Sequence, residues 1–173
     1  MPDRPVILTG FMGSGKSSVG RVLARRLARR FVDLDSKIVA ASGCSINDIF
    51  ARDGEAAFRL LESEQLERVL SENEGAVIAT GGGAVVSLQN RTLMRSRGVI
   101  VNLKVTLEQV LHRLKGSNDR PLLAFDDAAN RAATLLNERE LFYADADIRI
   151  DTDGKSVEDV ATEILCRLKG FSE

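Results

Sequence analysis

The segment Gly10–Ser17 (GFMGSGKS) constrains the fold more than any other part of the chain, because it matches the phosphate-binding pattern G-x-x-x-x-G-K-[ST]. A short β-branched apolar run, residues 5–9, precedes it, which is typical of a strand. Apolar residues recur after it at helical spacing: Val19, Val22, Leu23 and Leu27. Strand, glycine-rich turn and helix are the context that this motif requires. We therefore expect backbone N–H groups to surround phosphate oxygens at a helix N-terminus.

Two side chains of this motif have separate expected roles. Lys16 is expected to reach the β- and γ-phosphates of a nucleotide, and the Ser17 hydroxyl is expected to bind Mg²⁺. The residues expected to line the phosphates are Gly13, Ser14, Gly15, Lys16, Ser17 and Ser18. A glycine-rich loop that only turns the chain is the alternative, but the flanking strand and helix favour phosphate binding.

Length and charge narrow the class of protein. A chain of 173 residues suits one domain with a sizeable core, so we expect a single domain over 1–173. The formal net charge is −1, which predicts no broad basic surface for nucleic acid or anionic membranes. No apolar run approaches the ~18 residues of a membrane span. Cys44 and Cys166 lack metal-ligand spacing, so we expect buried or idle thiols and a cytoplasmic location.

Strand-like and helix-like segments alternate along the chain. The apolar runs typical of strands are 5–9, 31–35, 76–80, 99–104 and 147–151. Helical patterns cover 16–29, 36–41, 46–52, 55–72, 87–96, 107–115, 127–143 and 157–169. Three pairs have capping-box spacing: Ser45 with Asp48, Thr106 with Gln109, and Ser156 with Asp159. This alternation predicts an α/β fold in three layers, a parallel sheet with helices on both faces, whose ligands gather at the carboxyl ends of the strands.

The second apolar run ends in two carboxylates, Asp33 and Asp35. The period of a strand would put both on one face, with Phe31. Beside a nucleotide–Mg²⁺ site, one carboxylate can hold the metal and the other can accept a hydrogen bond from an attacking hydroxyl. The alternative is a pair of strand-end aspartates that only cap the next helix. Because no aspartate ends the run 76–80, Asp33 is the candidate for the second metal ligand.

Glycines and arginines suggest where a second substrate binds. Gly81–Gly83 follow the third run and allow backbone to approach a ligand closely. Arg59 can pair with Glu62 on one helix, since they are three residues apart. If Arg59 and Arg139 both face the cleft, they form a fork for a carboxylate, although their positions in the sequence do not establish that they converge.

A polar loop between two helices, residues 116–123, contains Arg120 and is interpreted as a lid over the phosphates. A tolerant surface loop is the alternative. The only histidine, His112, lies in a helical pattern, where a partly exposed structural role fits better than catalysis or zinc binding.

In this order, the motifs resemble the shikimate kinase family over nearly the whole chain. The specific parts are Asp33-x-Asp35, Ser45-Ile46-x-x-Ile49-Phe50, Gly54-Glu55-x-x-Phe58-Arg59-x-x-Glu62, Gly81-Gly82-Gly83, Arg120-Pro121-Leu122-Leu123, and Arg139 with Tyr143. The resemblance implies a P-loop kinase fold like that of the nucleoside monophosphate kinases, with strand order 2-3-1-4-5. It also implies a substrate-binding helical segment over about 36–62 and a lid over about 114–126.

The same resemblance implies transfer of the γ-phosphoryl group of ATP to the 3-hydroxyl of shikimate, on the pathway to chorismate and the aromatic amino acids. Shikimate would be held by Asp35, Arg59, Gly82 and Arg139, the two arginines binding its carboxylate. Catalysis would rest on Asp35, Lys16 and Arg120, with Arg120 on the phosphates, Arg113 and Lys155 near adenine, and Mg²⁺ held by Ser17 and, through water, Asp33. We expect the enzyme to be a monomer.

Two other functions stay open from sequence. One is another small-molecule or nucleotide kinase of the same fold, although the Arg59, Gly82 and Arg139 set favours a carboxylate acceptor. The other is a nucleotide-binding switch, against which the absence of an N-K-x-D guanine-recognition motif counts. The departures from the family pattern are small. Ser18 stands where threonine is common, and Glu-Leu-Phe-Tyr follows Arg139 where many relatives have proline before Leu-Tyr.

Overall fold

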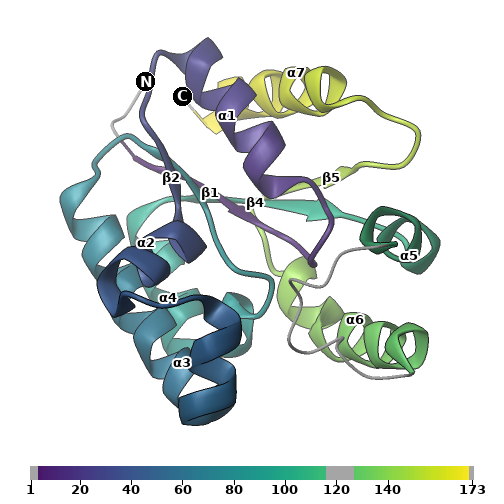
Figure 1. Ribbon diagram of the computed structural model, residues 1–173. Helices are drawn as coiled ribbons and strands as arrows, with labels where there is room; N and C mark the ends of the chain where they lie inside the picture. The colour runs from purple at the N-terminus through teal and green to yellow at the C-terminus, as the bar shows by residue number, and fades with distance from the viewer. Residues whose placement is uncertain (1–3, 116–126, 172–173) are drawn as a thin grey trace.

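The computed structural model describes residues 4–115 and 127–171, and its centre is a five-stranded parallel sheet (Figure 1). The strands are β1 Val6–Thr9, β2 Phe31–Asp33, β3 Val77–Ala79, β4 Val99–Lys104 and β5 Ile148–Asp151. Their order is β2-β3-β1-β4-β5, so the predicted α/β fold and strand order are confirmed. Because β1 is central, the phosphate-binding segment that follows it lies at the middle of the carboxyl edge.

Helices follow each strand, near the residues that the sequence predicts. They are α1 Lys16–Leu27, α2 Leu34–Ser42, α3 Ile46–Glu72, α4 Leu88–Arg97, α5 Leu107–Leu114, α6 Ala128–Ala144 and α7 Val157–Leu168. Short 3-10 turns are η1 Ala84–Val86 and η3 Lys169–Phe171. The predicted break between helices 46–52 and 55–72 is a kink inside α3, where Gly54 has φ 85° and ψ 174°. All three capping boxes form as predicted.

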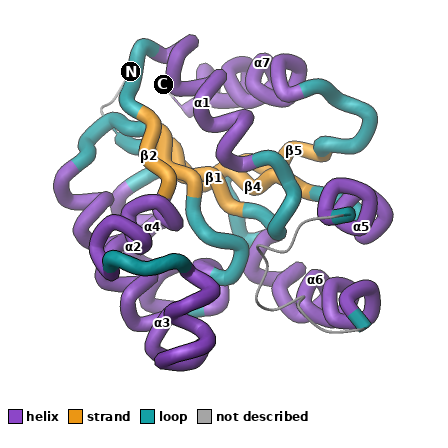
Figure 2. Tube along the Cα trace, viewed as in Figure 1, coloured by secondary structure: helices purple, strands orange, loops and turns teal. Residues whose placement is uncertain are grey.

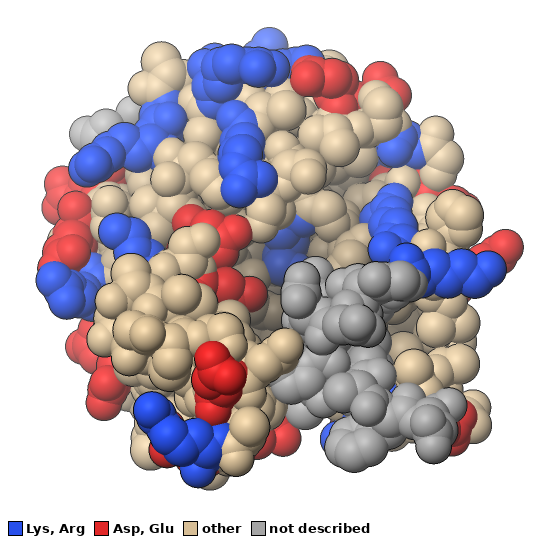
Figure 3. All heavy atoms as spheres, viewed as in Figure 1, with Lys and Arg blue, Asp and Glu red and all other residues tan. Residues whose placement is uncertain are grey.

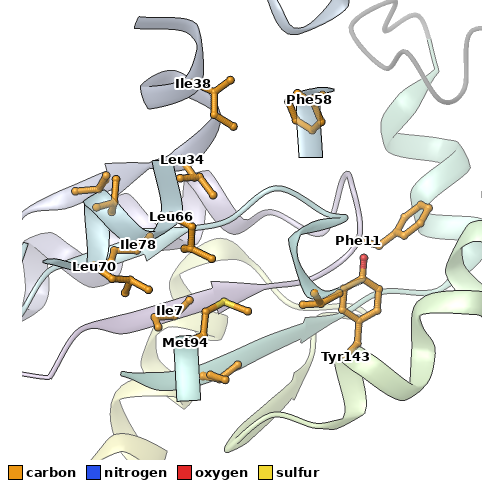
Figure 4. Close-up of a cluster of buried hydrophobic side chains, with 14 of the residues drawn as sticks. Ile7, Phe11, Leu34, Ile38, Phe58, Leu66, Leu70, Ile78, Met94 and Tyr143 are labelled. Carbon is orange, nitrogen blue, oxygen red and sulfur yellow. The ribbon is translucent and has the colours of Figure 1, made fainter. Parts of the chain in front are cut away.

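Two apolar cores sandwich the sheet, as the layers in Figures 1 and 2 show. Side chains alternate between them: Leu8 packs toward α1 and α7, whereas its neighbour Ile7 packs on the opposite face. Figure 4 shows this second core, with Phe11 and Tyr143 at one end of it. The second core also packs α3, α4 and α6, the helices that carry Arg59 and Arg139 or support them.

The expected strand over residues 31–35 is wrong at its end. The strand stops at Asp33, and Asp35 lies in the first turn of α2. The physical reason is that the Asp33 side chain accepts a hydrogen bond from the Ser36 backbone N–H and caps a helix that begins at Leu34. The two aspartates therefore do not share a strand face, and Asp33 performs the capping role that was the alternative interpretation.

The two cysteines and His112 are partly or fully exposed. Cys44 is half-buried and Cys166 is exposed, and neither forms a disulfide. His112 is exposed. In residues 4–115 and 127–171, no helix has both the length and the apolar composition needed to cross a bilayer.

Candidate active site

The phosphate-binding loop has the geometry that its sequence predicts. Gly13 and Gly15 adopt left-handed backbone conformations, with φ of 76° and 91°, which glycine tolerates far better than other residues. Within the described residues no side chain caps α1, so its first N–H groups face the loop. Lys16 Nζ donates to the carbonyl oxygens of Gly10 (2.7 Å) and Phe11 (3.0 Å), which places the ammonium across the loop. An anion here would meet both the amide groups and this positive charge.

Ser17 and Asp33 meet beside the loop, as the sequence predicts for metal ligands. The Ser17 hydroxyl donates to Asp33 Oδ2 at 2.6 Å, while Asp33 Oδ1 caps α2. Among the described residues no three His, Cys, Asp or Glu side chains cluster as a metal site. A hydroxyl and one carboxylate fit Mg²⁺, which keeps several waters and takes further oxygens from nucleotide phosphates. Residues present at this point therefore suit a nucleotide-bound Mg²⁺.

Arg113 and Lys155 come together at the far side of the loop. Arg113 Nη1 donates to the Gly13 carbonyl at 2.7 Å, and Lys155 forms an ion pair with Glu163 at 2.7 Å. Arg113 and Lys155 both line a cavity of about 260 Å³ between the loop, the end of β5 and α7. Its other lining residues are Gly13, Ser14, Gly15, Ser18, Val19, Thr152, Val157 and Val160. The apolar wall from α7 suits a flat base.

A second cavity, about 340 Å³, lies on the other side of the loop. Three of its charged residues come from three different helices: Asp35 on α2, Arg59 on α3 and Arg139 on α6. The remaining lining residues are Met12, Val39, Ser45, Ile46, Asn47, Phe50, Phe58, Glu62, Gly81, Gly82 and Gly83. Figure 3 shows acidic and basic side chains bordering a hollow in the middle of the visible face. The structure thus brings Arg59 and Arg139 to one cavity.

Arg59 is held by a buried carboxylate. Its Nη1 donates to Glu62 Oε2 at 2.8 Å, and Glu62 is only 1% exposed. Glu62 Oε1 is buried and has no hydrogen-bond partner among the described residues. Burial raises the pKa of Glu62 above its ordinary value of 4.5, and the nearby Arg59 opposes this effect. The predicted pair therefore exists, but it belongs to the wall of the cavity and not to the surface.

Arg139 is 4% exposed and lies above the ring of Phe11, 5.9 Å from its centroid. One turn along α6, the Tyr143 hydroxyl donates to the Gly82 carbonyl oxygen at 2.5 Å. Burial raises the pKa of Tyr143 to about 12, so this donor keeps its proton at neutral pH. The bond connects α6 to the segment Gly81–Gly83 and so restricts the position of Arg139 in the cavity.

The triple glycine is explained by crowding and not by unusual backbone angles. A Cβ at Gly83 would overlap the guanidinium group of Arg59, and one at Gly81 would lie 2.6 Å from Glu62 Oε1. A Cβ at Gly82 would come within 3.2 Å of the Met12 nitrogen. Any side chain would displace either the arginine, its carboxylate partner or the phosphate loop.

The two outer cavities are joined by a third, of about 260 Å³, which includes Lys16, Ser17 and Asp33. It shares Met12, Asp35, Gly81 and Gly82 with the 340 Å³ cavity, and Gly13, Gly15, Ser18 and Arg113 with the cavity beside α7. Three adjoining cavities therefore lie along the carboxyl edge of the sheet. This is the arrangement that ligand sites in such sheets adopt.

The sequence identified most of this site, and some of its members were missed. Arg120 and the residues of the proposed lid from 116 onward lie outside the described residues. The spacing and the family motif both single out Glu62 beside Arg59, but neither predicts that Glu62 is buried in the wall of the cavity. The apolar walls from Phe50 and Phe58, whose ring centroids are 4.7 Å apart, were not assigned to the site because periodicity alone marks them as core.

The fold and the site define a P-loop phosphotransferase with a separate acceptor cavity. Comparison with known proteins gives the family. The family model for shikimate kinase matches residues 12–169, so the chain belongs to the shikimate kinase family and is a kinase that uses ATP. A shikimate kinase of Geobacter metallireducens is 58% identical over 167 residues, covering 96% of this chain and 93% of its own. One from Geobacter sulfurreducens is 57% identical, covering 93% and 88%.

Solved structures agree with this assignment. The shikimate kinase from Acinetobacter baumannii in complex with shikimate has a TM-score of 0.94 and 35% identity, over 96% of this chain and 93% of that one. The enzyme from Aquifex aeolicus has a TM-score of 0.85 and 38% identity, over 97% and 98%. The recognition made from motif order is confirmed at the level of both sequence and fold.

Proposed function

We propose that this chain transfers the γ-phosphoryl group of ATP to the 3-hydroxyl of shikimate, giving shikimate 3-phosphate and ADP for the synthesis of chorismate and aromatic amino acids. The observation that carries the proposal is the shared wall of Met12, Asp35, Gly81 and Gly82 between the phosphate cavity and the cavity that holds Arg59 and Arg139. An acceptor held by both arginines would lie next to the γ-phosphate of a bound nucleotide.

On the nucleotide side, we assign the loop residues Gly13, Ser14, Gly15 and Ser18 to the phosphates, and Arg113 and Lys155 to the neighbourhood of adenine. Lys16 would exchange its two carbonyl partners for β- and γ-phosphate oxygens and neutralise charge as the group transfers. Ser17 and, through water, Asp33 would hold Mg²⁺, which when bound would neutralise charge on the phosphates.

On the acceptor side, two fixed guanidinium groups suit a carboxylate, since arginine offers paired N–H donors in a planar fork. Glu62 keeps Arg59 in place, and the Gly82 backbone offers close approach without a side chain. Asp35 lies where both cavities meet and would orient the attacking hydroxyl. A carboxylate is a weak base toward an alcohol, so Asp35 would take the proton only as the new P–O bond forms.

We further propose that the whole chain, 1–173, works as one kinase domain, a monomer in the cytoplasm, with Arg120 of a 114–126 lid on the phosphates. The single sheet, with its two cores, supports the single domain. The net charge of −1 supports small-molecule substrates over nucleic acid.

The test of the reaction is ADP release with ATP and Mg²⁺ in the presence of shikimate, quinate or a nucleoside monophosphate. We expect release that depends on shikimate and disappears in Lys16→Ala. Release that depends on quinate or on the monophosphate, and not on shikimate, would overturn the assignment of the acceptor.

The role of Asp35 has its own test. Asp35→Asn keeps the size of the side chain but removes the charge, so we expect kcat to fall by about 10²-fold or more while the KM for ATP changes little. Steady-state kinetics with both substrates measures this. Equal losses in kcat and in ATP affinity would mean that Asp35 supports the structure instead of the transferring hydroxyl.

A further inference from the structure

A row of polar side chains crosses three neighbouring strands of the sheet, β1, β4 and β5. Thr9 of β1 is paired in register with Asn102 of β4, and Asn102 with Arg149 of β5. Directly paired residues of parallel strands point to the same face, here the face covered by α6. Thr9 and Asn102 are each 1% exposed, on a face whose other buried strand residues, such as Ile7 and Ile100, are apolar.

These side chains are connected by hydrogen bonds. Asn102 Nδ2 donates to Thr9 Oγ1 at 3.4 Å, and Arg149 Nε donates to Asn102 Oδ1 at 3.1 Å. Arg149 Nη2 then donates to Glu140 Oε1 of α6 at 2.7 Å. The row therefore runs from the residue before the phosphate loop to the helix that carries Arg139 (Figure 1).

Glu140 is the neighbour of Arg139 in the sequence, and Tyr143 follows one turn later. Two polar bonds thus fix the helix within one turn after Arg139: Tyr143 to the Gly82 carbonyl, and Glu140 to Arg149. A rotation or slide of α6 would break one of these bonds, and it would also move the Arg139 guanidinium relative to the acceptor cavity.

We propose that Arg149 is a positioning residue. It holds α6 against the sheet and so keeps the Arg139 guanidinium in the acceptor cavity, beside the phosphate loop. Nothing in the motif set discussed above includes Arg149. The inference rests on the proposed role of Arg139 in binding the acceptor, and it names Arg149 as the residue that sets the position of Arg139.

Arginine suits this position because one side chain must donate to two acceptors on different elements at the same time. Its planar group directs Nε toward Asn102 and Nη2 toward Glu140 at the same time. Arg149 is 28% exposed and Glu140 44% exposed, so the pair is partly shielded from water. A lysine could reach only one acceptor at a time, and an apolar residue would leave the buried Asn102 oxygen without its donor.

The experiment compares Arg149→Met with Arg95→Met. Arg95 also holds the segment after α6 by an ion pair, with Asp145, the C-cap of the helix, at 2.8 Å, but neither residue lines any of the three cavities. We expect Arg149→Met to raise the KM for shikimate about tenfold with the KM for ATP within twofold. Arg95→Met, which removes an ion pair of the same kind, is expected to leave both values within twofold.

A double-mutant cycle separates positioning from general destabilisation. Arg139→Lys alone tests the proposed clamp and should raise the KM for shikimate. In an Arg139→Lys background, Arg149→Met should add less than about threefold, because its effect passes through Arg139. If Arg139→Lys does not change the KM for shikimate, the proposed clamp fails. If it does raise this KM, two results overturn the positioning role: Arg149→Met alone has no effect, or its full effect multiplies that of Arg139→Lys in the double mutant.

Arg149→Met can fail to fold, since Asn102 is buried. In that case Glu140→Gln replaces Arg149→Met in the experiment. It keeps the shape of the side chain and a hydrogen-bond acceptor, and it removes the charge that attracts Arg149. We expect a rise of about threefold in the KM for shikimate, again absorbed in the Arg139→Lys background. A KM that does not change in Glu140→Gln, with the clamp effect of Arg139→Lys present, would also overturn the proposal.

Discussion

The nucleotide side and the acceptor side of the site are built in different ways. The phosphate loop is one contiguous segment, Gly10–Ser17. The groups that it offers to a phosphate are mainly its own backbone N–H groups and the N-terminus of α1. The acceptor cavity takes its charged groups from α2, α3 and α6, which come together only in the folded chain. Its arginines are held by other side chains: Arg59 by Glu62, and the helix of Arg139 by Tyr143.

The difference indicates where each half is sensitive. A backbone site survives most changes of side chain but depends on its one lysine for charge. A site made of side chains from several elements depends on supporting residues that never touch the substrate. The first two substitutions below should therefore affect one substrate and spare the other. The expected effects decrease from a charge at the phosphate loop, through an arginine of the acceptor cavity, to residues that only support that cavity.

The largest effect is expected from Lys16→Ala. It removes the positive charge placed across the phosphate loop, which should lower kcat by about 10²–10³-fold, equivalent to ~3–4 kcal/mol of transition-state stabilisation. Because the acceptor cavity does not include Lys16, calorimetric titration with shikimate should give an unchanged Kd. Lys169→Ala, a change at an exposed lysine, is the control. Loss of shikimate binding in Lys16→Ala would show that the two halves are not independent.

Arg59→Lys should produce the opposite pattern. Lysine keeps the charge but loses the fork, so the KM for shikimate should rise by about 10-fold or more, since a hydrogen bond to a charged group is worth ~1.5–3 kcal/mol. The KM for ATP should stay within twofold. Arg68→Lys is matched to it, because Arg68 lies on the same helix and pairs with Glu72 at the surface. A KM for shikimate that does not change would remove Arg59 from the clamp.

The same contrast explains what the sequence predicts well. The phosphate loop, its flanking strand and helix, and the capping boxes are local patterns, so their residues determine their geometry directly. The alternation of strands and helices predicts the parallel sheet, and the motif order, through its resemblance to a family, predicts strand order 2-3-1-4-5.

The parts that sequence reasoning placed poorly depend on contacts between elements. The start of α2 at Leu34 depends on the Asp33 side chain, which caps the helix and removes Asp35 from the strand. The burial of Glu62 follows from its packing beside Gly81, where there is no room for a Cβ. Arg149 and Asn102 meet only because β4 and β5 are neighbours, so no spacing along the chain could have linked them.

A smaller effect, on stability, is expected from Glu62→Gln. Burial holds the pKa of Glu62 above 4.5 in the folded protein, so the folded state retains a proton that the unfolded state loses. The stability associated with Glu62 is fully present below pH 4.5 and is lost as pH rises through the folded-state pKa. Glutamine does not titrate. The free energy of unfolding of the wild type, minus that of Glu62→Gln, should therefore fall as pH rises above 4.5, by about 1.4 kcal/mol per unit of raised pKa.

Urea unfolding between pH 4 and pH 8 measures this difference. Glu72→Gln is the matched control, because Glu72 lies on the same helix and is exposed. A difference that is independent of pH, or that grows in favour of the wild type, would contradict the sign given for Glu62.

The smallest effect is expected from Tyr143→Phe, which removes one hydroxyl and nothing else. The lost hydrogen bond to the Gly82 carbonyl should lower the free energy of unfolding by about 1 kcal/mol. Because burial raises the pKa of Tyr143 to about 12, the hydroxyl is protonated in both folded and unfolded protein between pH 6 and 9, and the loss should be constant over that range. The KM for shikimate should rise less than in Arg59→Lys, and the KM for ATP should not change. A rise as large as that of Arg59→Lys would contradict this order, because the Tyr143 hydroxyl would then contribute as much to acceptor binding as the fork of Arg59.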